Sequence, residues 1–579
     1  MKYSTYLIYL LFFGVTSAMA QPAYHRIWGV KENRKVDIDS YIKGIQIADD
    51  VVYYDILNKI NALQLPQATT ETFIEIGTPE TTSIGIKYQS NSGNWYVIGY
   101  TTETEDFTTA GAYRTEFDYE APTPKNSFLA KYSATGELQW CTYIDWFYGS
   151  DGTLHHTNIT TDEEENVYFV SYKPNDEVIE NAPFQSTANP EDFFISLDRA
   201  ATITKLNSNG AYQWSTFFGM HYTQIRSLVA TPDGIVIAGD VISTENFGGG
   251  VPVSNFNYFS TEGAYRESPN INSSGELSPS SFINKFDFNG ERLWGTYYDF
   301  IFDGVLTYGN DIYVVGGNSS ENAATEGAFI ETSPANTQVR PLLGRLSSNG
   351  SELLWRTYLR NEIFESGFNY RKASINSDGN IWLFGQTSST TGVATDDAYQ
   401  TEKNMVTANN NDSYHLLLAN DGSTVLYSSY YGFEGDDAPL AIFPAENGYY
   451  SVEQTSGNSN PENFITQGNL LEPDEEGSST YGGLVYSYFS TEEPMSSSIF
   501  DKKKISIYPN PVENVLHLTG EIEDFTKIEI YNMQGQQVFQ QPINTSEIIS
   551  VDINSLASGV YLLTISNTTD KQTYRVVKK

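Results

Sequence analysis

The sequence contains a unit that recurs six times at intervals of about 70 residues, and this period constrains the fold more than any other feature. Each copy has a strongly apolar segment: GNWYVIGYT at 93–101, ENVYFVSYK at 165–173, GIVIAGDVI at 234–242, DIYVVGGNS at 311–319, NIWLFGQT at 380–387 and GYYSVEQT at 448–455. Repeats on this scale are typical of solenoids, propellers and arrays. Because a repeated element builds the core of each unit, we do not expect an active site within it.

A second repeated element has an apolar strand, a turn with glycine and a strand with Trp. Its copies are FLAKYSATGELQWCTYI at 128–144, ITKLNSNGAYQWSTFF at 203–218, FINKFDFNGERLWGTYY at 282–298, LLGRLSSNGSELLWRTYL at 342–359 and the diverged HLLLANDGSTVLYSSYY at 415–431. Glycine suits tight hairpin turns that need a positive φ. We assign this role to Gly136, Gly210, Gly290, Gly350 and Gly422. We expect the tryptophans to pack between units rather than stack on sugars: Trp140, Trp214, Trp294 and Trp355, with Tyr427 in the fifth copy.

A third, shorter element follows the first in most units, so each unit offers about four short strands. It reads TAGAY at 109–113, TEGAY at 261–265, TEGAF at 325–329 and TDDAY at 395–399, with eroded copies at 181–185 and 466–470. Four-stranded units in series favour an all-β protein built as a β-propeller, because its blades close into a ring and protect their edges. An open β-solenoid is the alternative.

The number of blades is six on the count of clear repeats, with seven as the other reading. The last unit lacks a Trp strand, and HRIWGV at 25–30 could supply the missing strand. ILNKIN at 56–61 faintly resembles FINKFD, which would add a seventh blade. The best helix candidate is Val51 to Leu65, although its apolar period is weak.

From NWYVIGYT through TTAGAY to FLAKYSATG and the Trp-x-Thr-Tyr strand, the repeat resembles the SBBP-type β-propeller repeat of bacterial extracellular proteins. The resemblance covers roughly residues 80–490, and the second unit departs from it most. It implies a scaffold fold and carries over no catalytic residues.

The first 20 residues have the features of a secretory signal peptide. Lys2 is followed by the apolar stretch YLIYLLFFGV, and Ala18 and Ala20 form a small-x-small cleavage site. This predicts a mature chain from Gln21. We expect no transmembrane span, because no segment reaches about 18 apolar residues. The single cysteine, Cys141, excludes an internal disulfide and is expected to be a buried structural thiol.

The charge distribution marks a domain boundary near residue 500. The chain carries 33 Lys and Arg against 72 Asp and Glu, a net charge of −39, which opposes binding to nucleic acid. From Asp501 onward the two signs almost balance, with 8 basic and 9 acidic residues. We therefore divide the chain into a signal peptide at 1–20, a propeller at 21–490, a polar linker at 491–504 and a small β-sandwich at 505–579.

The C-terminal segment resembles the type A sorting domain of the Bacteroidetes type IX secretion system. The matching residues are Tyr508, Pro509, Asn510 and Pro511, Tyr531 with Gly535, Leu556 with Gly559 and Tyr561, and the basic end Lys578 and Lys579. The resemblance implies export across the outer membrane, with the type IX machinery as partner and the cell surface or medium as destination.

No catalytic, cofactor or metal motif stands out. None of the six histidines, at 25, 155, 156, 221, 415 and 517, lies in a zinc-binding HExxH pattern, and no nucleophile elbow or phosphate loop is present. The acidic clusters at 162–165 and 472–476 do not match a calcium loop, and we interpret both as solvated turns. The long insertions at 172–184 and 246–259 are better candidates for binding a ligand.

Three functions follow from these observations. The first is a secreted or cell-surface propeller that binds a polysaccharide or a surface protein, or serves as a scaffold, without catalysis and without a cofactor. The second is an extracellular glycan lyase or hydrolase, in which paired carboxylates would meet in the channel. The third is a protein whose repeats pack against other envelope components.

Overall fold

The computed structural model describes most of the chain as short β-strands. The described residues are 25–32, 46–48, 51–56, 59–64, 69–117, 126–147, 158–188, 199–219, 223–241, 257–271, 280–299, 301–318, 322–333, 340–359, 373–403, 411–432, 437–445, 447–455, 484–491, 505–520, 522, 525–532, 536–543, 548–567 and 571–579. Among them the structure contains strands and no helix. The chain forms two compact units, Met1–Glu492 and Glu493–Lys579.

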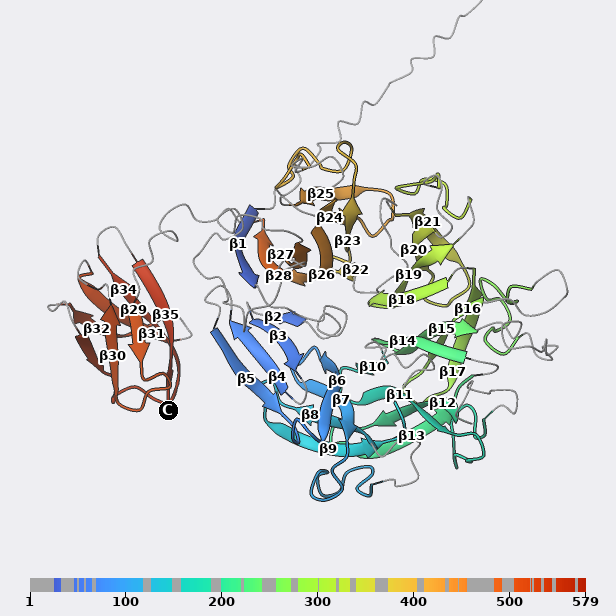
Figure 1. The fold of residues 1–579 in the computed structure, drawn as a ribbon, viewed down its shortest axis with the longest axis horizontal. Coiled ribbons are helices and arrows are strands. Elements are labelled where there is room, and N and C mark those ends of the chain that lie inside the picture. The colour runs from blue at the N-terminus through green and yellow to red at the C-terminus, as the bar shows by residue number, and fades with distance from the viewer. Residues whose placement is uncertain are drawn as a thin grey trace, which may run out of the picture. The chain divides into compact units, whose positions relative to one another are not determined.

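The described part of the first unit contains seven four-stranded antiparallel sheets, arranged as blades around a common centre (Figure 1). Blades 1 to 3 are β2 (Gln46–Ala48), β3 (Val51–Ile56), β4 (Lys59–Gln64) and β5 (Thr69–Glu75); β6 (Thr82–Gln89), β7 (Trp95–Thr101), β8 (Asn126–Tyr132) and β9 (Leu138–Ile144); and β10 (Ile159–Thr161), β11 (Val167–Pro174), β12 (Arg199–Leu206) and β13 (Tyr212–Phe217).

Blades 4 to 6 repeat this order. They are β14 (Thr223–Thr231), β15 (Gly234–Val241), β16 (Ser280–Phe286) and β17 (Arg292–Tyr298); β18 (Ile301–Tyr308), β19 (Asp311–Asn318), β20 (Arg340–Leu346) and β21 (Leu353–Tyr358); and β22 (Ala373–Ile375), β23 (Ile381–Thr387), β24 (Asp412–Leu418) and β25 (Val425–Tyr431).

Blade 7 is built from both ends of the propeller sequence. It combines β26 (Asp437–Ala445), β27 (Gly448–Thr455) and β28 (Leu484–Ser490) with β1 (His25–Glu32), which pairs with β28 as the outer strand. The segment 25–30 therefore supplies the missing strand, as the sequence suggested. Since β1 also precedes blade 1 in the chain, this pairing links the last blade to the first.

The all-β propeller is confirmed, and the structure has the larger of the two blade numbers considered. Blade 1 is the copy without a clear repeat, and ILNKIN lies across its β3–β4 turn. The helix expected at Val51 to Leu65 was wrong, because this stretch forms the β3–β4 hairpin, with Val51 paired to Gln64 and Ile56 to Lys59. A short apolar run does not distinguish a helix from two short strands, and pairing within the blade decides the outcome.

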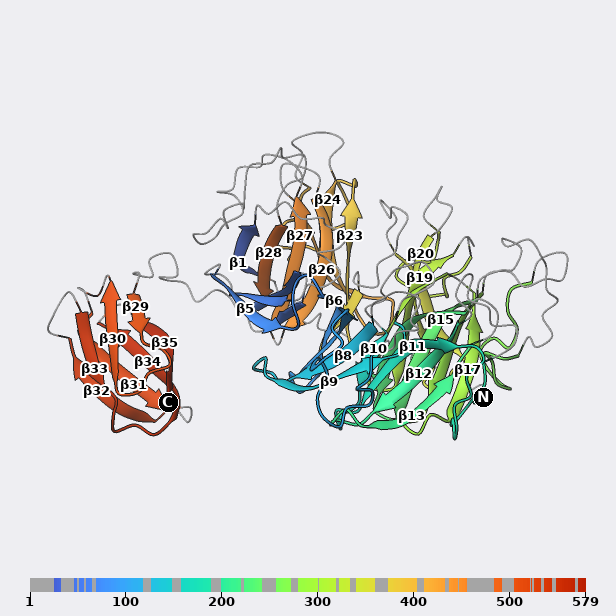
Figure 2. The same cartoon turned by 60° about the horizontal axis from the view of Figure 1, so that its bottom comes forward.

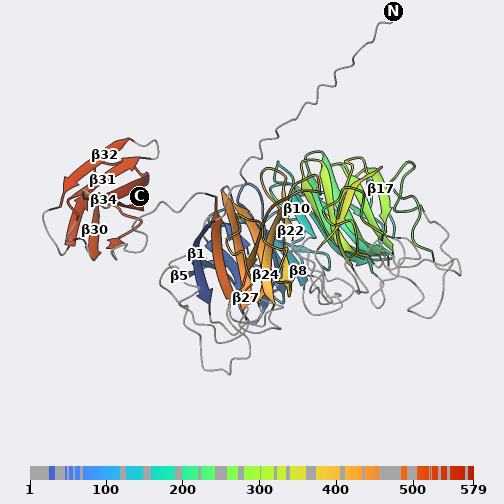
Figure 3. The same ribbon diagram turned by 90° about the horizontal axis from the view of Figure 1, so that it is seen from above.

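The first repeated segment is the second strand of its blade and is buried between neighbours. Every residue of β7 and of β15 is buried. One apolar cluster joins Ile203 of blade 3 to Ile235 and Ile237 of blade 4, and the next joins Ile283 of blade 4 to Ile312 of blade 5. The core is therefore a series of interfaces between blades, seen edge-on in Figure 3.

The tryptophans join each blade to the turn of the next. The indole Nε1 of Trp294 in blade 4 donates to the carbonyl of Ser348 in blade 5 at 3.0 Å. Gly350 in the same turn has φ 68°, and a Cβ built there would lie 2.3 Å from the Trp294 ring. The same donation recurs from Trp140 to Ser208, from Trp214 to Phe288 and from Trp355 to Asn420.

The third repeated element lies along the outer strand of its own blade. Thr325 N donates to Arg356 O, and Tyr358 N donates to Ile330 O, so this segment hydrogen-bonds with the outer edge of β21. Phe329 N also donates to the carbonyl of Gly422 in the next blade. Because an unprotected edge strand favours aggregation, we interpret this element as an edge cover.

The described residues of the second unit form two sheets of short strands (Figure 2). One has the order β29 (Ile505–Tyr508), β30 (Val515–Gly520) and β33 (Ile548–Asp552). The other has the order β32 (Gln537–Pro542), β31 (Lys527–Asn532), β34 (Gly559–Ser566) and β35 (Lys571–Lys578). The two sheets share one apolar core, which includes Leu516, Leu518, Ile528, Ile530 and Leu563.

Candidate functional site

The two ends of the blades differ in their connections. At one end, which we call the loop end, the second strand of blades 2 to 7 is joined to the third by long segments: 102–125, 175–198, 242–279, 319–339, 388–411 and 456–483. At the opposite end, the turn end, the third and fourth strands of blades 2 to 6 are joined by short turns: 133–137, 207–211, 287–291, 347–352 and 419–424.

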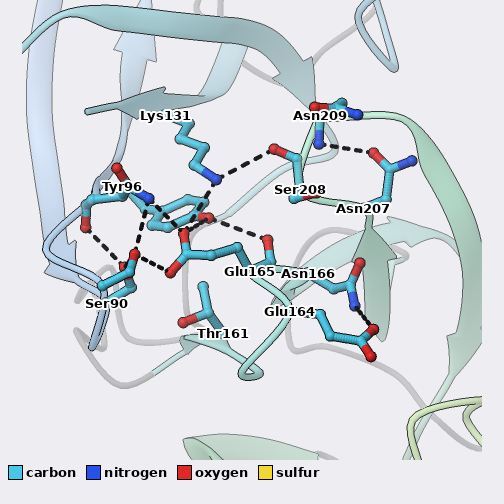
Figure 4. A network of polar contacts seen from close by, with 12 residues as sticks. Ser90, Tyr96, Lys131, Thr161, Glu164, Glu165, Asn166, Asn207, Ser208 and Asn209 are labelled. Carbon is cyan, nitrogen blue, oxygen red and sulfur yellow. Dashed lines mark hydrogen bonds and ion pairs between the residues drawn. The ribbon is translucent and has the colours of Figure 1, made fainter. Parts of the chain in front are cut away.

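A polar network at the turn end joins blades 2 and 3 (Figure 4). Lys131 Nζ on β8 lies 3.1 Å from Glu165 Oε2 on the turn between β10 and β11. The Glu165 carboxylate also accepts from Ser92 Oγ at 2.6 Å, from Asn94 Nδ2 at 3.1 Å and from Tyr96 OH at 2.8 Å. The carboxylate is therefore surrounded by donors from blade 2.

These donors control the ionisation of the network. Burial alone would raise the pKa of the Glu165 carboxyl, but side-chain hydrogen bonds from Ser92, Ser90, Asn94 and Tyr96 outweigh it and lower the pKa to about 2. Burial and the nearby carboxylate raise the pKa of Tyr96, so its hydroxyl keeps the proton that it donates. Glu165 is thus held as an anion.

The cation in this network belongs to a repeated contact. Lys131 Nζ donates to Ser208 O at 3.3 Å, the carbonyl that also accepts from Trp140. Equivalent donations run from Lys205 to Phe288 O at 3.1 Å and from Arg345 to Asn420 O at 3.4 Å. The turn end is therefore occupied by contacts that hold neighbouring blades together.

The acidic cluster at 162–165 lies in this region, and its carboxylates bind protein groups. Asp162 accepts from the backbone N–H groups of Glu164 and Asn166 and from Tyr168 OH, at 3.1, 2.9 and 2.9 Å. In the described part of the chain, no group of three or more His, Cys, Asp or Glu residues could hold a metal ion. The second cluster, 472–476, lies outside the described residues.

At the loop end, three described carboxylates, those of Asp145, Asp240 and Asp299, contact cations. Asp145 follows β9 and contacts both Arg114 and Lys173, with 3.0 Å between Asp145 Oδ2 and Lys173 Nζ. Burial on its own would lower the pKa of Lys173, but the neighbouring Asp145 carboxylate reverses the effect and the pKa is raised. These three residues form an ion-paired group between blades 2 and 3.

Blades 4 and 5 carry similar pairs near the same end. Asp240 on β15 contacts the Arg226 side chain of β14 and accepts from Ser281 Oγ at 2.7 Å. Asp299 lies 2.5 Å from Arg356 Nη1. Each of these carboxylates therefore has a cationic partner.

Of the histidines, His415 and His517 have described side chains. His415 is 1% exposed, and its Nε2 lies 2.7 Å from Glu453 Oε1. His517 contacts Ser550 in the second unit. His155, His156 and His221 lie outside the described residues, and His25 lies on β1.

The structure describes all of the candidate insertion 172–184 and only the end of the insertion 246–259. Within 172–184, Val178 is 64% exposed, and it forms a bridge with Thr187. Of 246–259, only the last three residues are described, and Phe259 among them is buried against Phe282, with ring centroids 4.1 Å apart.

In the second unit, the structure brings the two ends of the predicted sorting motif together. The Asn510 side chain donates from Nδ2 to Arg575 O at 2.9 Å and accepts at Oδ1 from Val577 N at 2.8 Å. Val512 N donates to Val577 O, and Lys579 N donates to Val512 O. The segment after β29 therefore hydrogen-bonds with the outer edge of the C-terminal strand β35.

The other motif residues lie around this junction. Gly559 pairs with Lys578, and Tyr561 pairs with Val576, between β34 and β35. Lys578 is 9% exposed, whereas Tyr508 is 45% exposed. The peptide bonds before Pro509 and Pro511 are cis. Gly535 lies outside the described residues, as do Ala18 and Ala20 of the predicted cleavage site.

Sequence reasoning missed the contacts that define these sites. Glu165 meets Ser92 and Asn94 about 70 positions away, and Asn510 meets Arg575 about 65 positions away, so no local pattern reports either contact. The repeat period does relate the first pair, because it places equivalent turns of neighbouring blades side by side.

Comparison with protein families identifies the second unit. Residues 506–579 match the secretion system C-terminal sorting domain. This domain marks proteins secreted through the type IX system to the cell surface or the extracellular space, so the chain is secreted by that route and interacts with its machinery.

Comparison with solved structures returns propeller proteins at low similarity. BamB from Moraxella catarrhalis matches with 11% identity and a TM-score of 0.31, over 81% of this chain and 97% of that one. Prolyl oligopeptidase B from Galerina marginata matches with 8% identity and a TM-score of 0.35, over 85% and 55%. No similar sequence was found among curated proteins. The structure has no helix long and apolar enough to cross a membrane within its described residues.

Proposed function

We propose that this type IX cargo is a non-enzymatic recognition protein whose propeller binds an extracellular polysaccharide or surface protein through its loop end. The resemblance to SBBP-type repeats of bacterial extracellular proteins, and to Bacteroidetes sorting domains, supports this assignment.

The mature chain begins at Gln21, and the intact mass of the secreted protein tests that boundary. A secreted chain that retained residues 1–20 would contradict it.

The observation that carries the proposal is the difference between the two ends of the blades. At the turn end, repeated residues are used in contacts between blades, as with Trp294 and Gly350. At the loop end, most of the six long connections contain the short repeated element, but the rest of their sequence is not repeated and their length varies, while the four-strand order of the blades is kept. Variable loops on a rigid scaffold are where binding residues concentrate.

Three carboxylates at the loop end are ion-paired, which favours recognition over glycan hydrolysis by these residues. A glycosidase needs two carboxyl groups that can act as acid and base or nucleophile. Asp145, Asp240 and Asp299 instead contact Lys or Arg side chains. These pairs hold the ends of neighbouring strands together, which is a structural role.

A polysaccharide panel tests the proposal with the full secreted chain. Binding and released reducing ends are measured together, and we expect binding without product. Replacing residues 246–256 by a Gly-Ser sequence of the same length keeps the buried Phe259 and the edge cover at 261–265, and it should weaken binding at least tenfold if that segment contributes. The matched control exchanges the turn 287–291 for the sequence of 207–211 at the opposite end, and it should bind normally. Product formation would support the lyase or hydrolase hypothesis instead.

Export is tested by deleting residues 505–579. We expect the truncated protein to remain in the periplasm, measured by cell fractionation and surface labelling. As a control, the same segment fused to an unrelated periplasmic protein should move that protein outward. Normal surface delivery of the truncated chain would contradict the sorting role.

A further inference from the structure

A buried polar cluster lies at the interface between blades 6 and 7. Glu453 Oε2 accepts from Ser413 Oγ at 2.6 Å, and Oε1 lies 2.7 Å from His415 Nε2. The other imidazole nitrogen, Nδ1, lies 3.0 Å from Tyr449 OH. Glu453 and Tyr449 are 0% exposed, and His415 is 1% exposed. Each heteroatom of the Glu453–His415 pair therefore has a partner within the protein.

The surroundings of this cluster are aromatic. The His415 ring lies 5.3 Å from the ring of Tyr431 and 5.7 Å from that of Phe489, and Phe489 stacks on Tyr449 at 4.7 Å. Apolar surroundings make an unpartnered carboxylate costly, because it has lost its hydration. Removing either Glu453 or His415 therefore leaves the other buried without its partner and should destabilise the interface between blades 6 and 7.

The same positions are apolar or small at the other interfaces. The strand registers align Glu453 with Gly99, Ser171, Gly239, Gly316 and Gly385. They align His415 with Leu129, Ile203, Ile283 and Leu343. Tyr449 likewise stands where Trp95, Val167, Ile235, Ile312 and Ile381 stand in other blades.

A smaller neighbour makes room for the Glu453 side chain. A Cβ at Gly99 would lie 2.9 Å from the Phe128 ring, and one at Gly385 would lie 2.9 Å from the Tyr414 ring. The residue paired with Glu453 is instead Val485. The residue paired with the aligned glycine is Phe128, Phe282, Leu342 or Tyr414 in the other blades, so the change from glycine to glutamate is accompanied by a smaller paired side chain.

Blade 7 must assemble from segments that are far apart in the sequence, unlike the other blades. Its strands come from residues 25–32 and 437–490, so it can form only when the two ends of the propeller sequence meet. Repeat proteins with similar units are prone to misassembly and to exchange of elements between copies. An interface that differs from all the others would direct this last step.

We propose that the Glu453–His415 pair, with Tyr449, is the determinant that makes blade 7 pack on blade 6 of its own chain rather than on another blade or on a second copy. If blade 7 packed against blades 2 to 5, Glu453 would face Leu129, Ile203, Ile283 or Leu343 and would be buried without its imidazole partner. Against blade 6 it finds His415 and Ser413. The pair therefore penalises wrong packing more than it favours the correct one.

The test uses the full chain and three variants: His415→Leu, Glu453→Gly and the double variant, which restores the repeat pattern. Each single variant should lower the thermal midpoint by more than about 5 °C, because one buried polar partner is left alone. The double variant should lose less than the sum of the singles. After dilution from denaturant, it should give at least threefold more oligomeric or protease-sensitive product than the wild type, measured by light scattering and limited proteolysis.

Two further variants keep the test decisive. Glu453→Gln preserves the side-chain volume and replaces Glu453→Gly if that single variant does not fold. Ser171→Gly removes a polar side chain at the equivalent position of blade 3 and should refold like the wild type. Additive losses in midpoint, clean refolding of the double variant, or equal misassembly of Ser171→Gly would each overturn the proposal.

Discussion

The turn end and the loop end of the propeller use their residues differently. At the turn end, a carbonyl in the glycine turn of one blade accepts a hydrogen bond from the indole N–H of the preceding blade. In three interfaces the same carbonyl also accepts from a Lys or Arg side chain. At the loop end, the polar contacts differ from blade to blade, as Asp145, Asp240 and Asp299 show. The turn end is therefore a constant surface on which the blades assemble, and the loop end is a variable surface.

This difference explains why a repeat can diverge at one end without losing the fold. A contact that recurs at the blade interfaces fixes the angle between neighbours, and a substitution there is felt by two blades. At the other end, the short repeated element within a connection also joins these contacts, as Phe329 does with Gly422, whereas the rest of each connection is not repeated. We therefore expect stability to depend on the turn end and recognition to depend on the loop end.

The largest loss of stability is expected for Gly350→Ala at the turn end. Gly350 has φ 68°, and a Cβ there would lie 2.3 Å from the ring of Trp294. Backbone strain and overpacking together should lower the free energy of unfolding by about 3 kcal/mol. Urea denaturation measures this loss.

Gly327→Ala is the matched control, because it isolates the backbone contribution. Gly327 has φ 82° with nothing within 4 Å of a built Cβ. This variant should lose only about 1 kcal/mol. Equal losses for Gly350→Ala and Gly327→Ala would show that the Trp294 contact does not matter.

A smaller effect is expected for Trp294→Phe. This change removes the donation to Ser348 O and part of a ring that is 8% exposed. We expect a loss of about 2 kcal/mol, measured by the same denaturation. Leu293→Ala is the control, since its side chain is next in sequence but 50% exposed. A larger loss for Leu293→Ala would contradict the assignment of Trp294 to the interface.

The sequence was sufficient to predict the parts of the fold that repeat. Its period and four-stranded units indicated a propeller, and the segment at 25–30 was identified as the strand that completes the last blade. The sorting domain was recognised because its motif residues have fixed identities at fixed spacing. In each case the information is local or periodic.

Other features could not be predicted because they depend on pairing between distant segments. Blade 1 lacks the glycine turn and the Trp, so its hairpin at Val51–Gln64 resembled a weak helix. Glu165 is the last of the consecutive acidic residues 162–165, and nothing nearby in the sequence indicated its partners in blade 2. Glu453 and Ser171 stand where the other four repeats have glycine, but nothing in the sequence indicated that His415 is the partner of Glu453.

A pH series on Glu165→Gln tests the polar network between blades 2 and 3 at the turn end. The folded state lowers the Glu165 pKa from 4.5 to about 2, so the native carboxylate contributes stability above about pH 4.5. This contribution is lost as the pH falls towards 2, because protonation then removes the acceptor charge. We expect the variant to be about 1 kcal/mol less stable at pH 7 and equal to the wild type near pH 2.

The control for this series is Glu164→Gln, which makes the same charge change on an exposed neighbour. Denaturation midpoints of the three proteins at pH 7, 4.5 and 2 provide the measurement. A difference between Glu165→Gln and the wild type that stayed constant over this range would show that the carboxylate charge is not what the network stabilises.

The smallest effect is expected at the loop end, for Val178→Ser. Val178 is 64% exposed, and its bridge to Thr187 is made by the backbone, which serine can keep. The free energy of unfolding should change by less than about 0.5 kcal/mol, whereas binding to a ligand that contacts this loop should weaken. Denaturation and binding measured on the same preparation separate the two effects. A stability loss as large as that of Trp294→Phe would mean that the connection 175–198 helps to hold the blades together. In blade 3, stability would then depend on the loop end as well as on the turn end.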